Sequence, residues 1–312
     1  MLVGFVARCR RGWGRSLFVG LIVALCLGCS PDASAPPPAG PTRLVSFSPA
    51  VTQMLVDLGQ GERIVGRQVL DPAAPAKAVA VGTQWQIDYE RLVSLRPTDI
   101  FLQFSADQVQ TRLQRLRELG RRYHWRIHHH PIETVQDVLQ ALYHEQDGQA
   151  SGVGAEVGEP ERARVLAEDL RTRLRKLREL TATSEPPAVL LVVRYNRQVT
   201  AAAPGTFIDE LLRAAGGHNV LPEGRALYPV LDAERLLALK PQVVVVLAQD
   251  AGADAPLRLP EGMRARVVRL VDPASLLPTT TMPRVAGKLA ALLHPEKADA
   301  IRRVISGSRA DD

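Results

Sequence analysis

The sequence predicts an α/β protein of two lobes, each with a mostly parallel sheet, joined by one long rigid helix. The main observation is that residues 87–97 and 231–241 are near copies of each other. Each copy has an Asp at its second position that can cap a helix, ends at a Pro, and leads into a run of apolar residues typical of a buried strand. The copies are separated by about the length of one small α/β domain, which indicates one copy in each lobe.

The first lobe, 43–158, is expected to alternate strands with helices. Ser48 can cap a helix that begins at Pro49, and Gly59 follows the end of that helix. A later helix has apolar residues at helical spacing and is expected to end at Gly120. Besides the short helix of the repeat, we predict strands at 44–47, 64–66, 79–82, 99–102 and 125–129, and helices at 49–58, 106–119 and 135–143.

The segment 159–182 is expected to connect the lobes. It contains a predicted helix from Glu161 to about Leu180, which would span about 30 Å. Its apolar stripe consists of Ala163, Ala167, Leu170, Leu174 and Leu177. The second lobe, 187–312, repeats the alternation, with strands at 189–193, 243–247 and 267–271, and helices at 206–215 and 284–293.

The N-terminus has the order of a secretory leader, with basic residues before an apolar run at 17–27. Gly28-Cys29 at its end resembles the lipobox of bacterial lipoproteins, in which the cysteine is lipidated, although Cys26 stands where Leu is usual. We therefore expect a signal peptide at 1–28, a lipid attached at Cys29 and a disordered tether at 29–42. A simple secretory peptide or an uncleaved anchor is the alternative. Cys29 would be the only cysteine of the mature chain, which excludes an internal disulfide.

The formal charge of the chain is +6, but four arginines of the leader account for most of it. The rest of the chain is close to neutral and has no motif for binding RNA or DNA. A nucleic-acid partner is therefore not expected.

The order and spacing of several short motifs resemble one family. These motifs are residues 43–52, which read RLVSFSPAVT, Leu58-Gly59, Ile64-Val65-Gly66, Val81-Gly82, 207–212, 215–220 and both repeat copies. Together they are similar to the periplasmic binding proteins with a rigid helical backbone, over residues 43 to about 295. The resemblance implies a binding protein rather than an enzyme. It would deliver cobalamin, a ferric siderophore, heme or a metal ion to the permease and ATPase of an ABC importer.

In that family an acidic residue on each lobe docks on the permease, and the matching positions here are Glu90 and Glu234. Exposed carboxylates add little to stability, but two on rigid lobes can align a partner and speed its association. The alternative is that each Glu only complements the dipole of its own helix.

The resemblance also implies a ligand in the cleft between the lobes. The matching loops offer a set of polar and aromatic residues: Arg67, Gln68, Trp85 and Phe104 from the first lobe, and Arg194, Tyr195 and Tyr228 from the second. Aromatic rings and arginines suit a planar or anionic ligand, whereas ordinary packing is the alternative for each of them. Three departures from the family pattern, Gln53, residues 69–72 and the position of Trp85, leave the ligand unnamed.

Three further motifs have plainer interpretations. Residues 128–130 are three histidines, of which only His128 and His130 can share a face of a strand. We expect solvated histidines rather than a metal site, because no acidic cluster lies near them in the sequence. The glycine-rich residues 152–158 lack the Lys-Ser/Thr of a phosphate loop and are expected to form a flexible entry to the long helix. The basic residues at 171–178 are expected to form its solvated face.

The leading hypothesis from the sequence is a lipid-anchored, periplasmic, monomeric solute receptor that captures a metal chelate without catalysis. A scaffold or sensor lipoprotein of the same fold is the first alternative. A free metal-ion receptor and an exported enzyme are further alternatives. The enzyme is disfavoured because the sequence lacks the His-Glu-x-x-His and Gly-x-Ser-x-Gly motifs.

Overall fold

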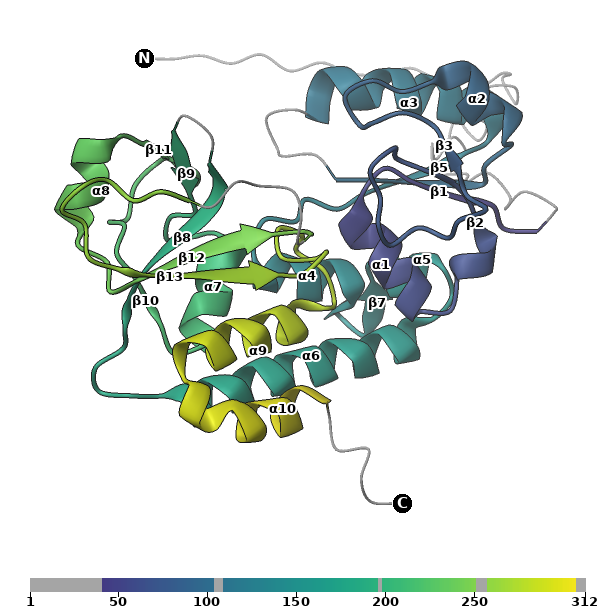
Figure 1. Ribbon diagram of the computed structural model, residues 1–312. Coiled ribbons are helices and arrows are strands. Elements are labelled where there is room, and N and C mark those ends of the chain that lie inside the picture. Colours follow the sequence, from purple (N-terminus) through teal and green to yellow (C-terminus); the bar gives the residue numbers. More distant parts are fainter. Residues whose placement is uncertain (1–40, 104–108, 196–197, 251–256, 307–312) are drawn as a thin grey trace, which may run out of the picture. The chain divides into compact units, whose positions relative to one another are not determined.

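The computed structural model describes residues 41–103, 109–195, 198–250 and 257–306 (Figure 1). The predicted signal peptide, the tether up to residue 40, Cys29 and Phe104 lie outside these residues. The described residues belong to one compact unit. None of their helices combines the length and the apolar composition needed to cross a bilayer.

The first sheet is wholly parallel, in the order β3-β2-β1-β4-β5. Its strands are β1 (Leu44–Ser46), β2 (Ile64–Arg67), β3 (Val79–Ala80), β4 (Asp99–Leu102) and β5 (Arg126–His129). The helices of this lobe are α1 (Pro49–Asp57), α2 (Tyr89–Ser94), α3 (Val109–Tyr123), α4 (Val135–Leu142) and α5 (Val153–Glu156). A hairpin of β6 (His144–Gln146) and β7 (Gln149–Ser151) separates the last two helices, and a 3-10 turn (Gly61–Arg63) precedes β2.

The second sheet is mixed, in the order β11-β9-β8-β12-β13, with β10 also beside β8. Its strands are β8 (Ala188–Tyr195), β9 (Val199–Ala201), β10 (His218–Asn219), β11 (Val230–Leu231), β12 (Val243–Ala248) and β13 (Arg266–Val271). Within this sheet β9 pairs antiparallel with both β8 and β11, and the other pairs are parallel. The helices are α7 (Phe207–Ala214), α8 (Ala233–Leu239), α9 (Met282–Leu293) and α10 (Ala298–Ser306), with a 3-10 turn at Pro295–Lys297.

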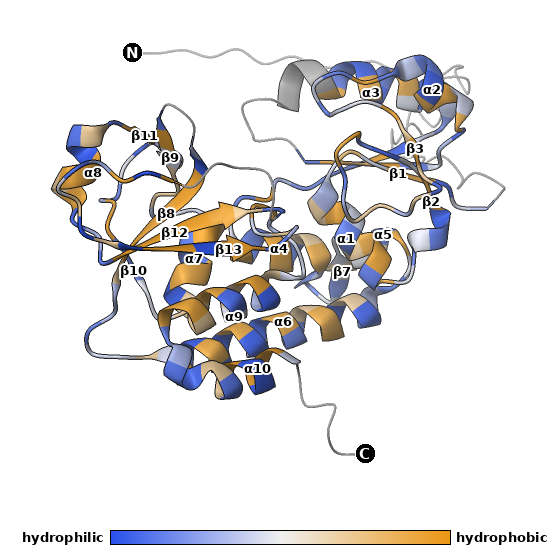
Figure 2. Cartoon of the chain, viewed as in Figure 1, coloured by the Kyte–Doolittle hydropathy of each residue, from blue (hydrophilic) through white to orange (hydrophobic). Residues whose placement is uncertain are grey.

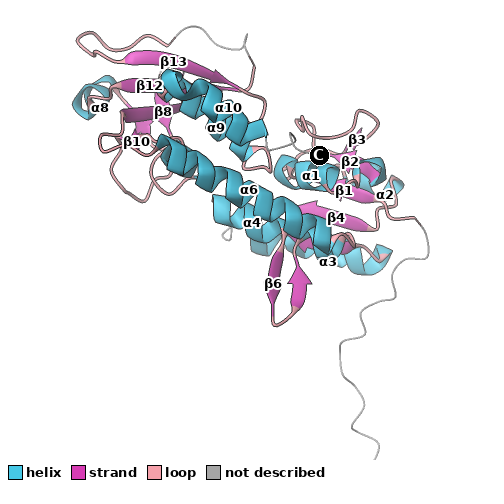
Figure 3. Cartoon of the chain, turned by 90° about the horizontal axis from the view of Figure 1, so that it is seen from below, coloured by secondary structure: helices cyan, strands magenta, loops and turns pink. Residues whose placement is uncertain are grey.

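The long helix is α6 (Pro160–Thr181), close to the predicted bounds (Figure 3). It contacts α4 and α5 of the first lobe and α7, α9 and α10 of the second. Its buried residues Ala163, Ala167, Leu170 and Leu177 lie in one apolar cluster that includes residues of both sheets, such as Leu44 and Val245. Figure 2 shows apolar colour on the sides of α6 and α9 that face other elements. The two lobes therefore share one core.

Successive residues of a strand point to opposite faces of its sheet. On the face that points away from α6, each sheet therefore packs in an apolar cluster of its own. In β12, Val243 and Val245 belong to the shared core, whereas Val244 packs in an outer cluster with Leu236 of α8. In the first sheet, Leu92 of α2 packs in the corresponding outer cluster. Helices α2 and α8, which carry the repeat, therefore lie on the sheet faces opposite α6.

Two local predictions were wrong. Helix α3 runs through Gly120 to Tyr123, and a Cβ at Gly120 would lie 3.0 Å from the side chain of Ile127. This glycine permits close packing on β5 rather than ending the helix. The glycine-rich segment is not a loose entry, because it contains helix α5. A Cβ at Gly154 would lie 2.2 Å from the Cβ of Ala163, so the glycine lets α5 pack directly against α6.

Candidate functional site

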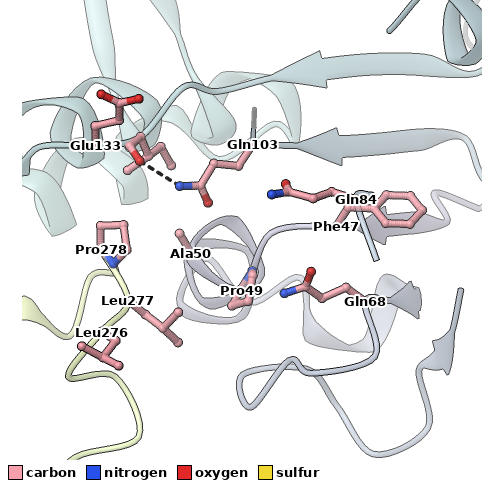
Figure 4. Close-up of a pocket in the computed structure, with 11 residues that line it drawn as sticks. Phe47, Pro49, Ala50, Gln68, Gln84, Gln103, Glu133, Leu276, Leu277 and Pro278 are labelled. Carbon is pink, nitrogen blue, oxygen red and sulfur yellow. Dashed lines mark hydrogen bonds between the residues drawn. The ribbon is translucent and has the colours of Figure 1, made fainter. Parts of the chain in front are cut away.

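A cavity of about 340 Å³ lies between elements of both lobes (Figure 4). The first lobe contributes the start of α1 and the loops after β1, β2, β3, β4 and β5, and the second lobe contributes the loop between β13 and α9. The lining residues are Phe47, Pro49, Ala50, Gln68, Gln84, Gln103, Ile132, Glu133, Leu276, Leu277 and Pro278. Since ligands of open parallel sheets bind at the carboxyl ends of the strands, the cavity is in the place that the topology favours.

Three glutamines form the polar part of the cavity. Gln103 is held at both ends of its amide: Ser48 Oγ donates to its Oε1 at 2.6 Å, and its Nε2 donates to the carbonyl of Ile132 at 2.8 Å. The side chain of Gln84 makes no hydrogen bond to the described residues, and that of Gln68 makes only a 3.5 Å contact to the carbonyl of Leu70. Figure 4 shows these glutamines facing the loop at 276–278 across Pro49 and Ala50. The cavity thus offers neutral hydrogen-bonding groups between apolar walls.

Of the predicted ligand residues in the first lobe that the structure describes, Gln68 lines the cavity, whereas Arg67 and Trp85 do not. Trp85 follows the lining residue Gln84 and is 50% exposed. The guanidinium of Arg67 donates to the carbonyls of Gln68, Val69 and Ala78 at 2.8–3.2 Å. Arg67 therefore fixes the loop after β2, and it is Gln68 of this pair that reaches the cavity.

The predicted residues of the second lobe lie near the cavity or apart from it. Tyr228 is 45% exposed, and its pKa is raised by burial and by the charge of Glu133, which lines the cavity. Arg194 and Tyr195 end strand β8 and are not part of the lining. Tyr228 is thus the residue of this group that is electrostatically coupled to the cavity.

Several lining residues were not predicted: Phe47, Gln84, Gln103, Glu133 and the loop at 276–278. Gln84, Gln103 and Glu133 each follow a strand of the parallel sheet, which is the available sequence signal. The loop at 276–278 has no such signal, because its place depends on contacts between distant segments: α9 packs on α6 and α7, and Thr280 donates to Asp57 of α1.

The two repeat glutamates occupy equivalent positions. Asp88 and Asp232 cap α2 and α8, accepting from the backbone N–H of Arg91 at 3.0 Å and of Arg235 at 2.9 Å. Glu90 and Glu234 lie in the first turns of these helices, are exposed, and make no ion pair with the described residues. Figure 1 shows α2 and α8 on the sides of their sheets that face away from α6. Both carboxylates are therefore available to a partner on that side.

The histidines at the end of β5 are not solvated as expected. His128 Nε2 lies 2.8 Å from Asp99 Oδ1, and its Nδ1 lies 3.2 Å from Glu156 Oε1. His130 Nε2 lies 2.9 Å from Glu156 Oε2. The side chains of His128 and His130 are only 14% and 10% exposed, and both rings stack on Phe101. The expectation failed because Glu156 is distant in sequence and reaches the histidines through α5.

This network holds opposite charges in a partly buried place. Burial would lower the pKa of His128, but the hydrogen bonds that its ring donates to Asp99 and Glu156 outweigh burial and raise this pKa to about 9. Hydrogen bonds from His128 and His130 likewise outweigh burial and lower the pKa of Glu156 to about 2. No group of three His, Cys, Asp or Glu residues suitable for a metal ion occurs among the residues that the structure describes. The network is thus an ion-pair cluster that ties β5 to α5 and β4.

Comparisons with known proteins agree with this architecture. The family model described as "Periplasmic binding protein" matches residues 44–261. The vitamin B12-binding protein of Photorhabdus laumondii is 27% identical over 240 residues, which cover 74% of this chain and 80% of that protein. The vitamin B12-binding protein of Yersinia pseudotuberculosis is 26% identical over 215 residues, covering 68% of this chain and 71% of that protein.

Solved structures are similar over most of the chain. A periplasmic heme binding protein from Pseudomonas aeruginosa has a TM-score of 0.65 and 25% identity, covering 82% of this chain and 94% of that chain. The periplasmic vitamin B12 binding protein BtuF of Vibrio cholerae has a TM-score of 0.59 and 20% identity, covering 82% of this chain and 97% of that chain. At 20% identity, the comparison with the Vibrio cholerae protein shows a similarity of fold alone.

Proposed function

Since this chain belongs to the periplasmic binding protein family, we propose that it is the solute-binding component of an ABC importer. Membership implies an exported, periplasmic protein that binds rather than transforms its ligand. Its partners would be the permease and ATPase of that importer. The ligand class is a metal chelate, such as cobalamin, a ferric siderophore or heme, and the curated relatives named above favour a cobalamin-like compound.

The lining of the cavity is the observation that carries this choice. Three glutamines and several apolar residues line it, and no cation does so among the described residues. Cobalamin carries many carboxamide groups on a large apolar ring, and amide side chains can both donate to and accept from carboxamides. Heme carries two carboxylates, which arginine and lysine recognise best. The cavity volume of about 340 Å³ is small for a whole corrinoid. The ligand would therefore also contact the rim near Trp85 and Tyr228, where aromatic surface is exposed.

Isothermal titration of the protein without its leader is expected to show binding of cyanocobalamin, with weaker or no binding of heme and of a ferric siderophore. A Gln84→Leu variant should weaken cobalamin binding roughly threefold to tenfold, because it removes a hydrogen-bonding amide from the cavity. Gln114→Leu on α3 is a matched control, since Gln114 is exposed and does not line the cavity. Tighter binding of heme than of cobalamin would overturn the choice of ligand. Binding of none of the three would favour a scaffold or sensor role instead.

We further propose that lipid attached at Cys29 anchors the protein to a membrane and that the chain acts as a monomer. Metabolic labelling with a fatty acid is expected to label the full-length protein and not a Cys29→Ala variant. A Cys26→Ala variant is the control, because it preserves the proposed attachment site. Label that persists in Cys29→Ala would contradict the anchor.

A further inference from the structure

Glu133 is the only ionisable residue that lines the cavity among those described by the structure. The remaining lining side chains are glutamines and apolar residues. In Figure 4 its carboxylate lies at the edge of the group, turned away from Leu276 and Leu277. The carboxylate is thus a single charge at the rim of an otherwise neutral site.

The backbone of Glu133 is fixed where the two lobes meet. Its N–H donates to Asp137 Oδ2 at 3.0 Å, as part of the cap of α4. Its carbonyl accepts from the N–H of Phe207, the first residue of α7, at 3.2 Å. The side chain is exposed and makes no hydrogen bond or ion pair with the described residues. Its position is therefore set by the backbone, while its charge is not neutralised by a neighbour.

The charge of Glu133 acts across to the second lobe. Tyr228 lies in the loop before β11, and the charge of Glu133 adds to the effect of burial in raising the pKa of that phenol. Arg67 keeps its positive charge, but its guanidinium is bonded to backbone carbonyls of its own loop and does not line the cavity, so Glu133 is the charged side chain that a ligand there would meet. The lining itself therefore presents negative charge to a ligand at this edge.

We infer that Glu133 determines the charge specificity of the cleft, favouring ligands that carry positive charge and disfavouring ligands that carry carboxylates. This inference rests on the proposed binding function and deepens it. An exposed carboxylate about 6 Å from a ligand charge in mostly aqueous surroundings changes affinity by roughly threefold per unit charge. The effect should diminish as salt is added.

The test uses three cobalamins that differ chiefly in charge: a monocarboxylic acid derivative, cyanocobalamin and aquacobalamin. At low salt and pH 6, the affinity of the native protein is expected to rise by roughly threefold at each step from the acid to the aqua form. Absorption spectra should be recorded alongside, to exclude replacement of the bound water by a protein side chain. Glu133→Gln should flatten this dependence, whereas Glu118→Gln, an exposed control on α3, should retain it.

A second measurement needs no ligand. The Tyr228 phenol, identified by comparison with Tyr228→Phe, is expected to ionise at lower pH in Glu133→Gln than in the native protein. Cobalamin binding with the same charge dependence in native protein and Glu133→Gln would overturn this inference alone. Failure of all three cobalamins to bind would overturn the choice of a cobalamin-like ligand and this inference with it.

Discussion

Reversing the charge of both repeat glutamates, Glu90→Lys with Glu234→Lys, is expected to abolish ligand-dependent stimulation of the cognate importer. Both carboxylates are exposed, lie in the first turns of α2 and α8, and have no ion-pair partner among the described residues. Replacing two attractive contacts by two repulsive ones at a docking surface costs several kcal/mol, which corresponds to a loss of 100-fold or more in association. Ligand affinity should not change, because neither residue lines the cavity.

The measurement is ATPase stimulation of the reconstituted importer, together with titration of the ligand. Glu145→Lys with Glu223→Lys is a matched control, since it reverses one exposed glutamate in each lobe outside α2 and α8, with Glu145 on the β6 hairpin. Each single reversal at Glu90 or Glu234 should have an intermediate effect. A double variant that loses ligand affinity would show that these residues serve binding or folding instead of docking.

Replacing His128 by Leu is expected to lower the free energy of unfolding by about 2–4 kcal/mol near pH 5.5, because Asp99 and Glu156 each lose a charged hydrogen-bond partner and keep only Arg126 and His130. The pKa of His128 is about 9 in the folded protein, above its usual 6.5, so its contribution is complete below pH 6.5 and is lost as pH rises through 9. The pKa of Glu156 is about 2, below its usual 4.5, so its contribution is complete above pH 4.5 and is lost as pH falls through 2. The network should therefore stabilise most between pH 4.5 and 6.5.

Urea unfolding of the native protein and His128→Leu between pH 4 and 10 would measure this difference. The difference in the free energy of unfolding between the two proteins should decrease toward pH 10. His144→Leu is the control, because His144 lies exposed on β6 and should show no such dependence. If the difference in the free energy of unfolding stays constant across this range, then His128 stabilises the protein through packing of its ring on Phe101 rather than through its charge.

Local patterns predicted most of the elements. The Ser48-Pro49 start of α1, the Asp caps of both repeat helices and the apolar stripe of α6 each depend on neighbouring residues, and each is present. Gly120 shows the limit of such rules. A glycine near the end of an apolar pattern usually ends a helix, but here the close approach of β5 requires it inside one.

The site was harder to predict because it depends on contacts between distant segments. Gln68 was identified, since it follows a strand in the place that the family resemblance indicated. Arg67 was expected beside it, but its bonds to three carbonyls of its own loop are invisible to sequence patterns. Likewise, Glu156 reaches His128 and His130 only after α5 has packed against α6, so their acidic partner could not be read from the sequence.

The apolar cluster that runs through α6 into both sheets has a consequence for how the molecule gains and loses its structure. Separate cores would allow one lobe to melt while the other persisted. With a common core, unfolding of either lobe exposes apolar surface of the other lobe. The free energy of unfolding one lobe alone therefore includes the loss of apolar burial in both. Although its topology is that of a duplicated unit, the chain should therefore unfold in a single cooperative transition, with neither half a stable product of proteolysis.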